Sequence, residues 1–242
     1  MDEGIRTAHI LAGVLALVAF WTAASMRKGS RRHRIAGRVY LLALFGILAS
    51  IVPMIVAVVS TDITMAVRLG YLMLIVTTAI WIAWRAIRDK QHVQRFVGPV
   101  FRTLATAMGL LGTFFLFIGI SRGSALVVGF GSIGIVYGIG MWWFALRGPT
   151  GPHWWLAWHF NGICLLFAAT HDSFLSLGLR SVLPELQGPV MRSLVLFGIL
   201  GLAVLLRIWL GRRFIPRLRT RGGELTDAAP NAKAPAFSTG AR

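Results

Sequence analysis

The stretch RKGSRRHRIAGRVY, from Arg27 to Tyr40, separates two apolar segments and contains six Lys and Arg residues and one histidine. Such a cluster is typical either of a nucleic-acid-binding patch or of the cytoplasmic side of a membrane protein. The flanking segments, approximately 7–26 and 35–60, are long and apolar enough to cross a bilayer. Their lengths favour the membrane interpretation, which the rest of the chain can test.

Composition places the whole chain in the membrane class. Of its 242 residues, 56% are hydrophobic and only 14% are charged, whereas an average soluble domain is about a quarter charged. Seven segments reach the length of a transmembrane helix, about 17–25 residues. They lie at approximately 7–26, 35–60, 65–85, 99–120, 124–146, 154–179 and 190–210. Each is too long and too continuously apolar for a strand of a membrane barrel, so the sequence predicts an all-α, polytopic bundle of about seven transmembrane helices.

The distribution of charge predicts the topology of this bundle. Of the 25 Lys and Arg residues, twenty fall in the first, third and fifth connections and in the segment from Arg207 onward, and five fall on the opposite side. Because positively charged loops stay in the cytoplasm, this asymmetry predicts an N-terminus outside and a C-terminus in the cytoplasm. The net charge of +17 therefore follows one membrane face. There it can contact anionic lipids, and nucleic acid is not an expected partner.

The predicted organisation is a transmembrane domain over residues 1–215 followed by a tail. Residues 216–242 are basic, small and proline-bearing, which is typical of a disordered cytoplasmic segment. Within the predicted fifth span, Gly134 and Gly138 form a small-xxx-small pair of the kind that lets two helices approach closely. We interpret the pair as packing inside one bundle, in preference to the interface of a homo-oligomer.

Tryptophans flank the predicted cytoplasmic ends of the helices. They are Trp81 and Trp84 before the third connection, and Trp142, Trp143, Trp154, Trp155 and Trp158 around the fifth. Because indole rings are enriched at headgroup depth, we interpret these residues as interfacial anchors and not as a binding site.

Polar and ionisable residues inside the predicted spans are the candidate functional residues, because such residues are costly in a bilayer. The candidate cofactor-binding residues are four histidines, His9, His33, His159 and His171, and two further polar residues of the sixth span are Asn161 and Asp172. A b-type haem in a membrane bundle takes a neutral imidazole from each of two facing helices. One candidate pair, near the outer surface, is His9 with His171. A candidate inner pair comes from His33, His92, His153 and His159.

The helical phase of these residues leaves several interpretations open. At about 100° per residue, His159 and His171 point about 120° apart, so the sixth span does not present two aligned haem ligands. Asn161 and Asp172 lie within about 20° of one face, which suits a proton relay, an ion ligand or hydrogen bonds to neighbouring helices. We favour structural roles for the histidines and for Asp172. With a single cysteine in the chain, no disulfide framework and no metal site are predicted.

Several motifs occur together in this chain. The first span contains His9 and Gly13, a Lys28–Gly29 turn follows, and HRIAGRVY from His33 to Tyr40 opens the second span. With the sixth-span pattern of His159, Thr170 and Phe174, they resemble a family of uncharacterised bacterial multi-pass membrane proteins, a domain of unknown function. The pair His171–Asp172 departs from that pattern. The resemblance implies a bacterial inner-membrane protein and supplies no activity.

The sequence therefore predicts a multi-pass protein of the bacterial inner membrane whose activity class stays open. We favour a non-enzymatic component, such as a transporter, a sensor or an accessory subunit of a complex, with membrane-protein partners or a homo-oligomer as open alternatives. The alternative function is a haem b protein that transfers electrons across the membrane or to a quinone through histidine ligands. Nothing in the sequence matches a catalytic triad, a phosphate loop, a zinc motif or a pair of acid–base carboxylates, so no catalytic residue is predicted.

Overall fold

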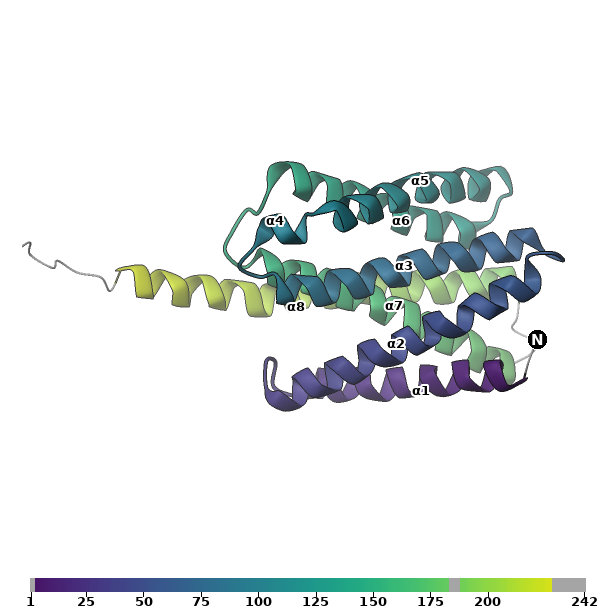
Figure 1. Cartoon of the computed structure of the whole chain (residues 1–242), viewed down its shortest axis with the longest axis horizontal. Coiled ribbons are helices and arrows are strands. Elements are labelled where there is room, and N and C mark those ends of the chain that lie inside the picture. Colours follow the sequence, from purple (N-terminus) through teal and green to yellow (C-terminus); the bar gives the residue numbers. More distant parts are fainter. Residues whose placement is uncertain (1–2, 183–187, 228–242) are drawn as a thin grey trace, which may run out of the picture.

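The described part of the chain is built from helices, which confirms the predicted all-α class. The structure, a computed structural model, describes residues 3–182 and 188–227 (Figure 1), and no strand occurs in these ranges. The helices in chain order are α1 (Glu3–Ser25), α2 (Arg31–Val58), α3 (Ile63–Arg88), α4 (Val93–Phe96), α5 (Pro99–Ser121), α6 (Ala125–Arg147), α7 (Trp154–Val182) and α8 (Pro189–Asp227).

Six long helices have the length and composition of membrane spans. They are α1, α2, α3, α5, α6 and the part of α8 from Pro189 to Ile215. The chain is therefore a multi-pass membrane protein whose helices contact lipid. In addition, α7 is 29 residues long and covers the predicted sixth span. Two features differ from the prediction: the short α4 occupies the third connection, and α8 continues past the expected boundary at residue 215 to Asp227. Residues 228–242 of the predicted tail lie outside the described residues.

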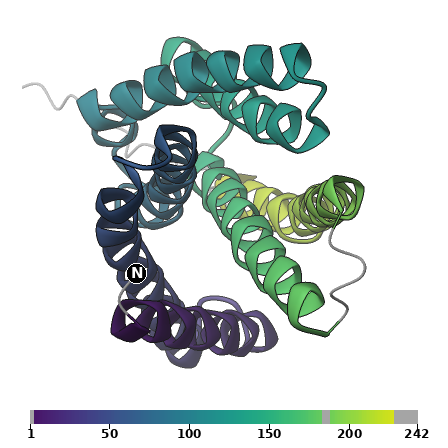
Figure 2. The same ribbon diagram turned by 90° about the vertical axis from the view of Figure 1, so that its right-hand side faces the viewer.

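The bundle contains three groups of helices. One hairpin is formed by α1 and α2, another by α5 and α6, and α3, α7 and α8 lie between them (Figure 1). Among these, α7 packs against α3, α8 and α1. Seen from the end of the bundle, α7 runs obliquely from the side of the α5–α6 hairpin toward the α1–α2 hairpin (Figure 2). Its path brings α7 close to helices that are far apart in the sequence.

Glycines allow α5 and α6 to pack backbone against backbone. Gly138 of α6 faces Gly109 of α5, and a Cβ atom added at Gly138 would lie 2.7 Å from the Gly109 Cα. Gly134, one turn earlier, lies against Gly112 in the same way. Helices in lipid associate through such close van der Waals contact, because no hydrophobic effect draws them together. The small-xxx-small pair therefore packs inside the bundle, as interpreted from the sequence.

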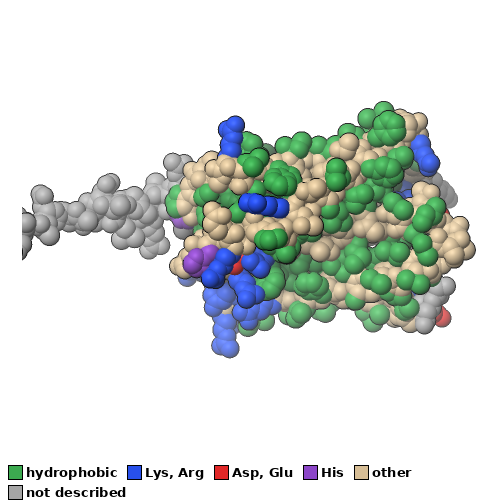
Figure 3. All heavy atoms as spheres, turned by 45° about the horizontal axis from the view of Figure 1, so that its top comes forward, with side chains coloured by type: hydrophobic (Ala, Val, Ile, Leu, Met, Phe, Trp, Pro, Cys, Tyr) green, Lys and Arg blue, Asp and Glu red, His purple; other side chains and the backbone are tan. Residues whose placement is uncertain are grey.

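Lys and Arg side chains gather toward one end of the bundle (Figure 3), which we call the basic end. It contains the connections at residues 26–30, 89–98 and 148–153, and α8 extends beyond it (Figure 1). The carboxylate of Asp89 binds Arg85 here at 2.5 Å, the one ion pair among the described residues. With only eight Asp and Glu in the whole chain, most cations at this end have no carboxylate partner.

The tryptophans of the basic end divide between surface and core. Trp84, Trp142 and Trp143 are exposed, as expected of interfacial anchors. Trp158 is instead buried, and its ring packs in an aromatic cluster with Phe96, Phe101 and Phe144. The interpretation of Trp158 as an interfacial anchor is therefore corrected: its neighbours lie on α4, α5 and α6, and it packs in the core.

Candidate functional site

The polar side chains of α7 define the candidate site. α7 begins at Trp154, directly after a turn that contains Gly151 and Pro152. The polar residues in its first nineteen positions are His159, Asn161, Thr170, His171 and Asp172. Because α7 packs against helices on several sides, these side chains meet protein groups from different parts of the chain.

His159 is positioned by a close approach of α7 to α3. Gly162 lies against the α3 backbone, and a Cβ atom added there would be 2.7 Å from the Ala83 amide nitrogen. Residues three apart share a helix face, so His159 meets the same stretch of α3. Its Nδ1–H donates to the Ala83 carbonyl oxygen at 2.8 Å. Because a carbonyl oxygen only accepts, the proton belongs to Nδ1, and Nε2 of the neutral ring keeps a lone pair.

His33 is held in the same way at the start of α2. Ser30 caps this helix, and its side-chain oxygen accepts the His33 backbone N–H at 3.2 Å. The His33 imidazole donates its Nδ1–H to the Ala23 carbonyl oxygen at 2.9 Å. Ala23 lies in the last turn of α1, where carbonyl groups have no partner within the helix. His33 therefore supplies a hydrogen-bond donor to an otherwise unpaired carbonyl group at the end of α1. This role goes beyond setting topology by charge.

Lys28 binds the same helix end. Its ammonium group donates to the carbonyl oxygens of Ala24 at 2.6 Å and Ala23 at 3.3 Å, where the negative end of the α1 dipole favours a cation. Partial burial in this position lowers the pKa of Lys28. Two candidate histidines, His33 near the start of α2 and His159 near the start of α7, lie toward the basic end, bonded to Ala23 and Ala83 respectively.

His171 lies in an aromatic environment between α7 and α1. The rings of Phe20 and Phe167 pack on its imidazole at centroid distances of 5.4 and 4.1 Å. Its Nε2 accepts a hydrogen bond from the Trp21 indole N–H at 3.1 Å, and its Nδ1 donates to the Phe167 carbonyl oxygen at 2.9 Å. Both ring nitrogens of His171 therefore have protein partners.

Two hydroxyl groups, those of Tyr40 and Thr170, lie at least partly buried in the bundle. Tyr40 of α2 is only 2% exposed, and its hydroxyl has no hydrogen-bond partner in the described part of the chain. The Thr170 hydroxyl of α7, in contrast, donates to the Leu166 carbonyl oxygen at 2.9 Å. The Tyr40 hydroxyl is thus a buried polar group that is incompletely satisfied.

His9 lies apart from His171. Its Nδ1 is 2.7 Å from the Ser50 hydroxyl of α2, and because that hydroxyl donates to the Ile47 carbonyl oxygen, the imidazole is the donor to Ser50. His171 meets α1 at Trp21, which lies about 18 Å from His9 along the helix axis. The structure does not bring the candidate outer pair, His9 and His171, together.

Asn161 connects α7 to two further helices. Its side-chain Oδ1 accepts from Nε of Arg207 in α8 at 2.5 Å, and its backbone carbonyl accepts from the Tyr137 hydroxyl of α6 at 2.9 Å. Arg207 counts among the cytoplasmic cations in the sequence, yet it is part-buried between α7 and α8. Neither Arg207 nor Tyr137 is predicted as a site residue. The sequence does carry a signal for Arg207, because it is a charged residue within the apolar run 202–210, where such residues are costly.

Asp172 is separated from the other polar residues of α7. Its Oδ1 is buried and has no hydrogen-bond partner in the described part of the chain. It shares a helix face with Asn161, but their eleven-residue spacing corresponds to about 16 Å of rise. Asn161 binds Arg207 while Asp172 does not, so the two polar residues do not form one site.

Within residues 3–182 and 188–227, no group of three or more His, Cys, Asp or Glu side chains is placed to hold a metal ion. No protein-family model, curated protein or solved structure matches this chain. The contacts of α7 are therefore the basis for a functional proposal.

Proposed function

We propose that the chain is a non-enzymatic component of the bacterial inner membrane that acts as a transporter, a sensor or an accessory subunit of a complex. One observation carries the proposal: polar groups of α7 bond to four other helices. His171 binds α1, His159 binds α3, and Asn161 binds both α6 and α8. Groups used in this way join helices to one another, as polar residues in membrane bundles commonly do. They are not arranged as an acid–base or nucleophilic site.

The proposal includes α7 as a seventh span, with the N-terminus outside and the C-terminus in the cytoplasm. The gathering of cations at the basic end supports this orientation, because basic loops stay on the cytoplasmic side. An odd number of spans agrees with termini on opposite sides. Membership in the family of uncharacterised bacterial membrane proteins is also a proposal, and it rests on the motif from His33 to Tyr40.

The contacts of α7 suit a component that changes arrangement. Hydrogen bonds between membrane helices are worth about 0.6 kcal/mol on average, so each holds α7 only weakly. A ligand or partner that binds more tightly to one position of α7 than to another raises the population of molecules with α7 in that position. The size of the shift is set by the difference between the two affinities. A transporter, a sensor and a regulated subunit all need such a response.

A specific observation favours a second function, haem b binding by His33 and His159. Both rings donate Nδ1–H to a backbone carbonyl, which fixes the tautomer that leaves Nε2 for a metal. Two neutral imidazoles from different helices are the donor set that a b-type haem takes, so the residues present fit the group. The haem would supply one-electron transfer. The chain would hold it through His33 of α2 and His159 of α7.

Purification of the full-length protein in mild detergent tests the first function. We expect a second polypeptide at fixed stoichiometry, for an accessory subunit, or a small molecule that raises the melting temperature, for a transporter or sensor. His9→Ala should leave that response nearly unchanged, because within the described ranges the His9 side chain bonds Ser50 of α2 and no group of α7. A haem at one copy per chain, lost in His33→Ala and in His159→Ala but kept in His92→Ala, would replace the first function by the second.

A further inference from the structure

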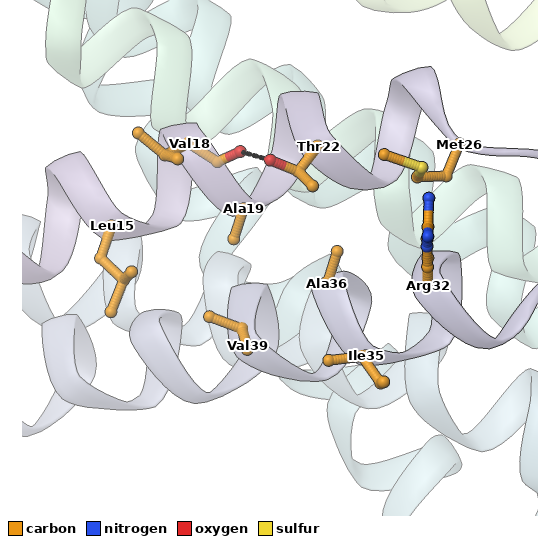
Figure 4. Close-up of a pocket in the computed structure, with 9 residues that line it drawn as sticks. All are labelled: Leu15, Val18, Ala19, Thr22, Met26, Arg32, Ile35, Ala36 and Val39. Atoms are coloured by element: carbon orange, nitrogen blue, oxygen red, sulfur yellow. Dashed lines mark hydrogen bonds between the residues drawn. The ribbon is translucent and has the colours of Figure 1, made fainter.

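The outer surface of the α1–α2 hairpin contains an open groove. Its volume is about 360 Å³, and it is lined by residues of α1 from Leu15 to Thr22, by Met26 just after α1, and by residues of α2 from Arg32 to Val39 (Figure 4). Ala19 and Ala36 are buried between the helices, whereas Val18 and Ile35 are exposed by 60% and 50%. The small residues leave a depression and the larger ones form its sides.

The groove is apolar along most of its length. Its one hydroxyl, that of Thr22, already donates to the Val18 carbonyl oxygen at 2.7 Å (Figure 4). Both helices are membrane spans, so the exposed side chains of the groove face lipid. From Leu15 to Ser25, the last residue of α1, the helix rises about 15 Å, roughly half of the 30 Å hydrocarbon core. The groove therefore matches an acyl chain from one leaflet in length and polarity.

Arg32 marks the polar end of the groove, at the basic end of the bundle. Its side chain extends from α2 toward Met26, which directly follows α1 (Figure 4). Two of the neighbouring cations are engaged by the backbone: Lys28 donates to the Ala24 carbonyl oxygen, and Arg34 donates to the Gly29 carbonyl oxygen at 2.7 Å. Arg32 has no hydrogen-bond or ion-pair partner among the described residues. It also lies in the first turn of α2, where the helix dipole favours an anion.

Charge complementarity identifies the occupant. The segment from Arg27 to Arg38 contains six cations and no acidic residue, so a phosphate there meets no competing carboxylate. A guanidinium group matches a phosphate with two parallel hydrogen bonds. We propose that this groove binds one phospholipid with a negatively charged headgroup, with an acyl chain along the groove and its phosphate on Arg32. The proposed lipid site requires only that the α1–α2 hairpin is inserted in a membrane. It does not rest on the proposed function.

Native mass spectrometry of the full-length protein, titrated with phosphatidylglycerol or phosphatidylcholine in detergent, tests the proposal. We expect the wild type to retain one phosphatidylglycerol in preference to phosphatidylcholine. Arg32→Gln should weaken phosphatidylglycerol binding about five-fold, equivalent to ~1 kcal/mol for one cation near a membrane surface. Arg38→Gln is the matched control: the same charge is lost from the same helix, outside the groove. It should change binding less than about two-fold, given that screening already weakens distant charges.

A second pair of variants tests the apolar part of the groove. Val18→Trp fills it and should lower phosphatidylglycerol retention while Arg32 is intact, whereas Val14→Trp, exposed on α1 outside the lining, should not. Melting curves establish that each variant is folded. Equal losses in Arg32→Gln and Arg38→Gln would overturn the proposal in favour of general surface charge. Equal retention of the two lipids, or unchanged binding in Val18→Trp, would also overturn it.

Discussion

His159 of α7 and Ala83 of α3 are joined by a 2.8 Å hydrogen bond across 76 residues of sequence. The donor is a ring N–H and the acceptor is a backbone carbonyl within a helix. Such a bond forms only where the two helices approach closely. Gly162, whose Cα faces the backbone of Ala79 and Ala83, permits that approach.

Gly162→Ala should therefore destabilise the protein. The added Cβ would lie 2.7 Å from the Ala83 amide nitrogen, and overpacking of this kind costs about 1–3 kcal/mol. Gly178→Ala on the same helix is the control, because no atom lies within 4 Å of its added Cβ. Thermal unfolding in detergent measures both. Equal melting temperatures for the two variants would contradict the close packing of α7 on α3.

The α5–α6 contact makes a similar prediction with a different pair of glycines. Gly138→Ala places a Cβ against the Gly109 backbone and should cost about 1–3 kcal/mol. Gly140→Ala, on the same helix in open space, should instead stabilise by roughly 0.4–1 kcal/mol, because alanine reduces the entropy of the unfolded chain. Urea-induced unfolding in mild detergent separates the two. A Gly138→Ala protein as stable as Gly140→Ala would show that α6 does not contact α5 here.

Asn161 and Arg207 should be energetically coupled. Asn161→Ala removes the acceptor of the part-buried Arg207 guanidinium, and Arg207→Met removes the donor of Asn161. Each loss of a partner costs roughly 1–3 kcal/mol. In the double variant no polar group is left without its partner, so its cost should be less than the sum, with a coupling energy of about 0.5–3 kcal/mol. A double-mutant cycle measures this quantity, and strictly additive effects would show that the two side chains do not interact.

Lys28 should make the stability of the protein depend on pH in the alkaline range. Partial burial lowers the pKa of Lys28 in the folded protein below its ordinary value of 10.5, which applies in the unfolded chain. At a pH between these two pKa values, Lys28 is protonated in the unfolded chain and deprotonated in the folded chain. The free energy of unfolding therefore rises with pH across this window, relative to a chain without Lys28. Melting temperatures of the wild type and Lys28→Met over the alkaline range test this. A difference that stays constant with pH would mean that Lys28 titrates equally in both states.

The sequence predicted the all-α bundle and the collection of cations at one end because each apolar segment and each loop carries its own signal. The partners of α7 carry no such signal. His171 meets Trp21 across 150 residues and Asn161 meets Arg207 across 46, and these contacts depend on which faces meet in the folded bundle. Periodicity places Asn161 and Asp172 on one face, but their separation along α7 gives them different surroundings.

Backbone acceptors explain why the role of His33 is missing from the sequence prediction. Its partner is the Ala23 carbonyl oxygen, and every residue has a carbonyl group, so no pattern of side chains marks this contact. Trp158 illustrates a related difficulty. A tryptophan near a helix end is typical of the membrane interface, yet the fold places Phe96 and Phe144 around Trp158 and buries it.

The absorbance spectrum of the full-length protein, purified from haem-replete cells, tests the non-enzymatic function most directly. We expect a folded preparation with a cooperative melting transition and no Soret band. In that case His33 and His159 serve through their Nδ1 hydrogen bonds to Ala23 and Ala83. A Soret band equivalent to one haem per chain, absent from His33→Ala and from His159→Ala, would contradict the non-enzymatic function and establish a redox protein.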